Sequence, residues 1–250
     1  MKIQISILMI LVTAFLFGQN QSQTTTSFAG ASTNINGLQA NQEGTLINIQ
    51  GTFSKILGLN ILEFDDLIFA EASMEGSSLL FDDWKQSATF FASDKKYRIN
   101  SVNYDIRRKS FIAKMSEDSL FTFDANLFSK AIVGNRTFIT HGSNAEPNKV
   151  YELIFDGANF QLVKKYSVKI KEGSPNPMLG QMRDKIIQQS SYYVLQNGAL
   201  EEIRLTKRNV LKILSKEEKD MALDYSRKYQ RSFRDEEELQ QILNYVSNQS

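Results

Sequence analysis

Hydrophobic and polar residues alternate in short runs along most of the chain beyond Gly76. The runs are rich in aromatic and β-branched residues, and turn-forming residues interrupt them about every 8 to 12 residues, a pattern typical of β-strands. The predicted strands are Ala88–Ala92, Lys96–Arg107, Ser110–Met115, Ser119–Asp124, Lys130–Val133, Thr137–His141, Lys149–Phe155, Phe160–Lys171, Ser191–Leu195, Leu200–Leu205 and Val210–Leu214.

The alternation indicates that each strand has one buried face and one solvated face. Val102, Tyr104 and Ile106 fall on one side of their run, as expected in an antiparallel sheet. Asp156–Gly157 and Asn197–Gly198 favour tight hairpin turns. A sheet of this many strands must curl or close, so we predict a mainly β fold: a strongly curved antiparallel meander, barrel-like or sandwich-like.

The hydrophobic period changes near the end of the chain. Ser215 with Glu218, and Asp235 with Glu238, form the spacing of helix capping boxes before apolar positions three and four residues apart. Residues 215–250 are therefore predicted to form a pair of amphipathic helices packed on the β domain, with a partner protein as the alternative cover for their apolar faces.

The beginning of the chain has the pattern of a secretory signal peptide. Lys2 precedes a largely apolar run, Ile3–Phe17, which is shorter than the roughly 20 residues that cross a bilayer. We predict a signal peptide at residues 1–22 with cleavage within Gly18–Gln23. The polar stretch 23–44 is predicted to be a flexible lead-in.

Residues 45–75 contain apolar side chains without a clear period of 2 or 3.6, so their structure is left open between loose strands and a short helix with a strand. They are assigned with the following strands to one antiparallel β domain, 45–214.

The charge and cysteine content exclude several classes of function. The chain has 29 basic and 28 acidic residues, and removal of Lys2 with the leader makes the two equal. A neutral chain has no overall field that attracts nucleic acid, and no apolar segment after the leader is long enough to span a membrane. The absence of cysteine excludes disulfides and thiolate chemistry. The basic clusters at Arg107–Lys109, Lys164–Lys165 and Lys207–Arg208 are interpreted as solvated strand edges rather than phosphate sites.

Motifs for catalysis and cofactors are lacking. The single histidine, His141, is interpreted as an exposed turn residue, because no G-x-S-x-G sequence accompanies it and one histidine without cysteine makes a poor zinc site. No phosphate-binding glycine loop is present. The pairs Asp65–Asp66 and Asp82–Asp83 lack the surrounding pattern of a calcium loop and are interpreted as solvated acids.

Two residue classes remain as possible sources of function. A glycosidase needs only two suitably placed carboxylates, and aromatic side chains can line a groove that stacks on sugars or peptides. No catalytic, cofactor-binding or metal-binding residue is assigned. The acids that stay open are Glu63, Asp65, Glu71, Asp82, Asp83, Asp105 and Asp124, and the aromatic residues are Phe81, Trp84, Tyr97, Tyr104, Tyr192 and Tyr193.

The stretches 96–105, 111–115 and 118–124, together with Tyr192–Tyr193 and the closing helical pair, carry a resemblance. In them the chain resembles uncharacterised exported proteins of Bacteroidetes-type bacteria. The resemblance implies the strand register and an exported location, and it brings no activity or site residue.

The sequence therefore predicts an exported protein, periplasmic or secreted, without a cofactor. Its expected role is a non-catalytic binding or structural module of the cell envelope, with an envelope protein or a glycan as partner. The alternative is a carboxylate-dependent hydrolase of surface polysaccharide. An open recess holding two acids roughly 5 to 10 Å apart favours the hydrolase.

Overall fold

A computed structural model describes residues 60–63, 73–114, 119–143, 146–174 and 183–249. The predicted signal peptide, its cleavage site, the polar lead-in and most of residues 45–75 lie outside this part of the chain.

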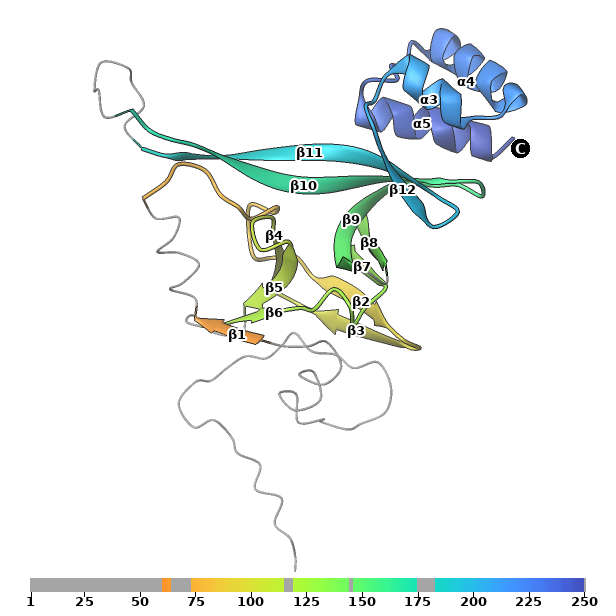
Figure 1. Ribbon diagram of the computed structural model, residues 1–250. Coiled ribbons are helices and arrows are strands. Elements are labelled where there is room, and N and C mark those ends of the chain that lie inside the picture. The colour runs from red at the N-terminus through yellow and green to blue at the C-terminus, as the bar shows by residue number, and fades with distance from the viewer. Residues whose placement is uncertain (1–59, 64–72, 115–118, 144–145, 175–182, 250) are drawn as a thin grey trace, which may run out of the picture. The chain divides into compact units, whose positions relative to one another are not determined.

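The prediction of a mainly β, antiparallel fold is confirmed (Figure 1). The described strands form a sheet of eight, in the order β12-β11-β10-β9-β8-β7-β2-β3, and a sheet of four, in the order β1-β6-β5-β4. Neither sheet closes on itself within the described residues. The strands are β1 (Asn60–Glu63), β2 (Ala88–Ala92), β3 (Lys95–Ile99), β4 (Val102–Asp105), β5 (Ser110–Lys114), β6 (Ser119–Thr122), β7 (Lys130–Val133), β8 (Arg136–Ser143), β9 (Glu146–Asp156), β10 (Gln161–Lys171), β11 (Lys185–Gln196) and β12 (Ala199–Ile203).

One predicted strand is in fact two. The run Lys96–Arg107 divides at Ser101, whose φ of 54° is left-handed, into β3 of the larger sheet and β4 of the smaller one. Because of this short turn, both strands direct apolar side chains toward the same core. The alternation alone therefore does not show that the run contains two strands. The predicted hairpin turn at Asn197–Gly198 is present, with φ of 52° and 77°.

The free edge of β4 is covered by the chain that precedes β2. Leu80 donates its backbone N–H to the Tyr104 carbonyl at 2.9 Å, and Val102 donates to the Gln86 carbonyl at 3.0 Å. Segment 78–86, which we call the covering segment, thus satisfies backbone groups that an edge strand would otherwise expose.

Two buried polar side chains of β4 fix the covering segment. The fully buried Asn103 amide donates to the Phe81 carbonyl at 2.8 Å and accepts from the Phe81 N–H at 3.0 Å. The fully buried Asp105 carboxylate accepts from the Arg107 and Arg108 N–H groups at 2.9 and 3.0 Å and pairs with the Arg108 guanidinium at 2.9 Å. Both side chains are used for structure.

A first hydrophobic core lies between strands of both sheets. Phe90 of β2 stacks on Phe123 with ring centroids 4.5 Å apart, and the rings of Phe111 and Phe128 meet it edge-on at 5.4 and 5.2 Å. These contacts join the two sheets through interlocking aromatic rings.

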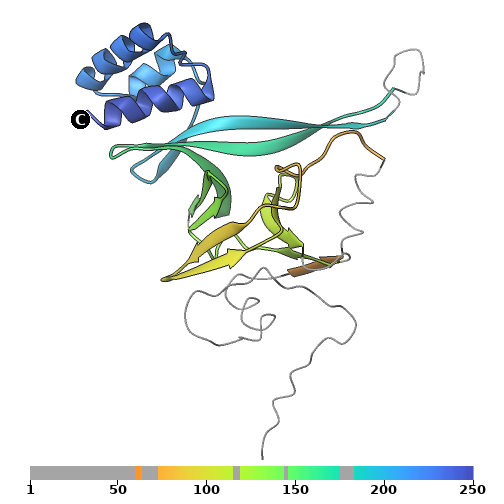
Figure 2. The ribbon, with the colours of Figure 1, turned by 180° about the vertical axis from the view of Figure 1, so that it is seen from behind.

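A second core joins β9, β10 and β11 to three helices, which Figure 2 shows together at the end of the chain. The predicted strand at Val210–Leu214 is wrong, because these residues lie in or directly after the first helix. Val210 and Leu214 are both buried, and their separation of four residues is a helical repeat that the short apolar run hides. The helices are α3 (Lys207–Ile213), α4 (Lys216–Tyr229) and α5 (Glu236–Ser247).

The predicted capping box of α4 is present, and that of α5 is only half present. Ser215 and Glu218 exchange both capping hydrogen bonds. Asp235 accepts from the Glu238 N–H at 3.0 Å, but the Glu238 carboxylate instead accepts from the Ser232 N–H at 2.8 Å. Glu238 therefore anchors the connection between α4 and α5 rather than closing a box.

Replacing Asn103 by Ala tests the role of the covering segment. We expect the free energy of unfolding to fall by about 2 to 4 kcal/mol, because buried groups at Phe81 lose their partners. Urea denaturation measures the change. Gln189→Ala, at an exposed position of β11, is the control and should stay within about 0.5 kcal/mol of the parent. Equal stability of both variants would contradict the assignment.

Candidate functional site

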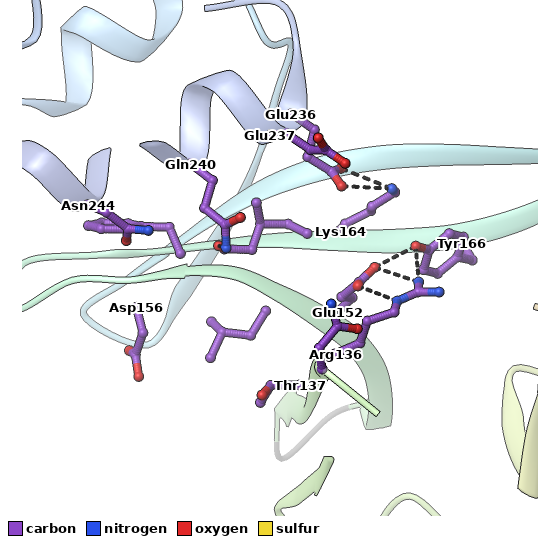
Figure 3. Close-up of a pocket in the computed structure, with 14 residues that line it drawn as sticks. Arg136, Thr137, Glu152, Asp156, Lys164, Tyr166, Glu236, Glu237, Gln240 and Asn244 are labelled. Atoms are coloured by element: carbon purple, nitrogen blue, oxygen red, sulfur yellow. Dashed lines mark hydrogen bonds and ion pairs between the residues drawn. The ribbon is translucent and has the colours of Figure 1, made fainter. Parts of the chain in front are cut away.

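Four central strands of the larger sheet place a row of side chains on one face. The register pairs Phe138 of β8 with Glu152 of β9, Glu152 with Lys164 of β10, and Lys164 with Tyr192 of β11. Directly paired residues of antiparallel strands share a face. The row therefore runs from the first core through an acid and a base to an aromatic ring. Figure 3 shows the acid, Glu152, and the base, Lys164.

Arg136 and Glu152 form a two-pronged ion pair at the inner end of this row. Arg136 Nε and Nη2 lie 2.6 and 2.8 Å from the two Glu152 oxygens, and the Tyr166 hydroxyl donates to the same carboxylate. The guanidinium also lies over the rings of Phe81 and Phe138 at 5.1 and 5.4 Å. The acid is thus held by charge, hydrogen bonds and an aromatic enclosure.

A second ion pair connects the row to α5. Lys164 Nζ lies 2.9 and 3.2 Å from the two oxygens of Glu236, and it also lies over the Tyr192 ring, 5.8 Å from the ring centroid. Nearby, the Gln240 side chain donates to the Ile154 carbonyl of β9 at 2.7 Å. These contacts fix the first two turns of α5 against β9 and β10.

Arg136, Glu152, Lys164 and Glu236 thus alternate in sign, and we call them the charge ladder. They line a recess of about 560 Å³ between β8–β10 and α5, which we call the polar recess (Figure 3). Its other polar lining groups are Asn135, Thr137, Asp156, Glu237, Gln240 and Asn244.

The ladder changes the acidity of the groups around it. Burial, the hydrogen bond to Glu152 and the Glu152 charge raise the pKa of Tyr166 far above its ordinary value. Burial and the contact with Glu236 likewise raise the pKa of Tyr192. Burial alone lowers the pKa of Arg136, but the hydrogen bond and charge of Glu152 outweigh it, so the net shift is upward. Both phenols therefore stay neutral hydrogen-bond donors.

The recess offers fixed hydrogen-bonding groups rather than reactive ones. Glu152 and Glu236 are each paired with a cation, and Asp156 accepts from the Gln161 amide at 2.7 Å. A retaining or inverting glycosidase needs one carboxyl group that gives up a proton and a second that is a base or nucleophile. The paired acids are arranged as counter-ions.

The carboxylates left open by the sequence do not gather at this recess. Asp105 is buried under the covering segment, and Asp83 accepts from the Lys85 N–H in a local turn at 3.0 Å. Asp124 accepts from the Asn126 N–H at 2.8 Å, also locally. Asp82 is exposed and Glu63 lies in β1, whereas Asp65 and Glu71 lie outside the described residues.

The candidate aromatic residues are also dispersed. Tyr104 is buried in the first core, with Phe81 and Tyr97 packed against it. Trp84 packs on the small cluster of Ile112 and Leu120. Tyr192 packs on the second core, and Tyr193 meets Tyr151 at 6.0 Å. His141 is half-buried in β8 rather than exposed in a turn.

One residue of the charge ladder, Glu152, can be recognised in the sequence, although the alternation of apolar and polar residues obscures it. Glu152 stands between apolar residues of a run expected to be buried, and a buried carboxylate needs a cation. The interpretation of Lys164 as a solvated edge residue is wrong, because its side chain is only 16% exposed and pairs with Glu236. Glu236 is remote in sequence and comes close only through the fold.

Among the described residues, no group of three or more histidine or acidic side chains is placed to hold a metal ion. None of the described helices has the length and apolar content needed to cross a membrane. No protein family, curated protein or solved structure matches the chain.

Alkaline unfolding tests the environment of Tyr166. Above about pH 10 the unfolded chain loses the phenol proton while the folded chain keeps it, so stability falls as pH rises. Tyr166→Phe should make this fall shallower by at most about 1.4 kcal/mol per pH unit, because one proton is removed from the linkage. Urea denaturation between pH 8 and 11 measures the slope. An unchanged slope in the variant would contradict the raised pKa.

Proposed function

We propose that the protein is an exported, non-catalytic binding module of the bacterial cell envelope, and that the polar recess binds a neutral glycan. Export rests on the apolar leader, and the ligand rests on the recess. The two parts of the proposal are therefore tested separately.

The observation that carries the proposal is the pairing of Glu152 and Glu236, the two recess acids of the charge ladder. Glu152, only 9% exposed at its side chain, is saturated by Arg136 and Tyr166. Glu236 is paired with Lys164. Groups held in this way keep their geometry without a ligand, which lowers the ordering cost of binding. They are poorly suited to exchanging protons with a substrate.

The chemistry of the lining favours a glycan over an envelope protein. Side-chain amides and carboxylates dominate the recess and can donate to and accept from many hydroxyl groups. The core of a protein interface is instead apolar and depleted of charge. The large hydrophobic side chains that are exposed among the described residues, Ile170, Tyr229 and Tyr245, do not line this recess.

Binding of neutral oligosaccharides prepared from bacterial surface polysaccharide tests the recess. Isothermal titration calorimetry on the purified chain should show binding that weakens about fivefold or more in Asn135→Ala and in Asn244→Ala, because each removes a hydrogen-bonding group. The two residues line the recess from the turn before β8 and from α5. Gln189→Ala, outside the recess, should bind like the parent.

A reducing-end assay on the same mixtures separates binding from hydrolysis. We expect the oligosaccharides to remain intact. Release of reducing ends by the parent chain, abolished in Glu152→Gln, would replace the proposal with a hydrolase. Binding that neither recess variant weakens would place the ligand elsewhere. Export is tested by fractionating the native host, and retention of the intact leader in the cytoplasmic fraction would contradict it.

A further inference from the structure

A second recess, which shares no lining residue with the polar recess, has a strongly positive wall. It has a volume of about 740 Å³ and lies between the start of α3 and the connection from α4 to α5. Lys207, Arg208, Arg231 and Arg234 line it, and no acidic residue does. We call it the cationic recess.

Most of the positive charge is uncompensated. Within the described part of the chain, no carboxylate is in ion-pair contact with Lys207, Arg208 or Arg234, and all three are exposed. Arg231 pairs with Glu238 at 3.2 Å, and its Nε is buried without a hydrogen-bond partner among the described residues. A chain of balanced overall charge thus concentrates cations at one hollow.

The remaining lining groups suit an anion attached to a carbon skeleton. The half-buried Leu211 provides apolar surface beside the cations, whereas Phe233, which also lines the recess, is buried. Thr206 and Ser232 add hydroxyl groups, and each of their oxygens already accepts a backbone N–H, at 3.3 and 3.1 Å, which leaves the hydroxyl hydrogen to donate.

We propose that the cationic recess binds a phosphoryl group carried by a sugar. Arginine presents a planar fork of N–H donors that matches phosphate oxygens, and three of the four cations are arginines. The apolar wall then contacts the carbon face of the sugar ring. The interpretation of Lys207–Arg208 as residues at a strand edge is wrong, because both residues lie in α3. The inference is independent of the polar recess.

Titration of the full purified chain with glucose 1-phosphate, inorganic phosphate and glucose tests the assignment. Calorimetry should show binding of the sugar phosphate, weaker binding of inorganic phosphate and none of glucose. The double variant Arg208→Gln, Arg234→Gln should weaken sugar phosphate binding about tenfold or more, since it removes two charged donors. Arg98→Gln, at an exposed position of β3, is the matched control and should bind like the parent.

Circular dichroism of each variant checks that the fold is kept. Equal affinity of the double variant and the parent would overturn the assignment, as would an inability of the parent to bind glucose 1-phosphate. Tighter binding of a single-stranded oligonucleotide, or of phosphatidylglycerol vesicles, than of the sugar phosphate would replace it with a nucleic acid or membrane surface. Asn244→Ala, which tests the polar recess, should not change the binding of glucose 1-phosphate, so each proposal can be refuted without the other.

Discussion

The ion pair between Arg136 and Glu152 is the constraint on which the centre of the larger sheet depends. The Glu152 side chain is nearly buried, and burying an unpaired carboxylate there would cost several kcal/mol. Lys164 and Glu236 repeat the arrangement one strand further and extend it to α5. The charge ladder therefore gives the second core and its helices one fixed position on the sheet. Apolar contacts tolerate several similar packings, whereas a two-pronged ion pair tolerates few.

The Arg136–Glu152 pair lies between the first core and the polar recess. On one side the guanidinium of Arg136 rests on rings of the first core, and on the other side the paired acids face the polar recess. The recess is thus preorganised by contacts that also hold the fold together. The covering segment follows the same rule on the smaller sheet, where Asn103 and Asp105 hold it through side-chain hydrogen bonds to Phe81 and Ser78. In both places polar side chains fix the position of a segment, and the aromatic cores provide the hydrophobic stabilisation.

Local patterns in the sequence predict most strands but few of the contacts that define the site. β2 and β7 were predicted at their observed bounds because alternation and turn residues both mark their ends. Val210–Leu214 was predicted as a strand because a five-residue apolar run fits both periods, and only the cap at Thr206 and the burial of Val210 and Leu214 distinguish the helix. Of the described acids considered for catalysis, Asp82 and Asp83 lie in the covering segment and Asp124 follows β6. Glu63 and Asp105 are strand residues, and none of the five lines the polar recess. Glu152 was not singled out, since its importance depends on Arg136 and Tyr166, which the register brings together and the sequence keeps apart.

The most direct measurement of the central claim is a double-mutant cycle on the free energy of unfolding, with Arg136→Met, Glu152→Gln and the double variant. If Glu152 is a structural counter-ion, Arg136→Met leaves its charge buried and costs about 3 to 5 kcal/mol. Glu152→Gln alone should cost about 2 to 3 kcal/mol, because it leaves the Arg136 charge without its counter-ion. If the double variant is no less stable than Arg136→Met, the coupling energy is at least this cost. Additive single effects, each below about 1 kcal/mol as for an exposed pair, would contradict the account and leave Glu152 available for chemistry.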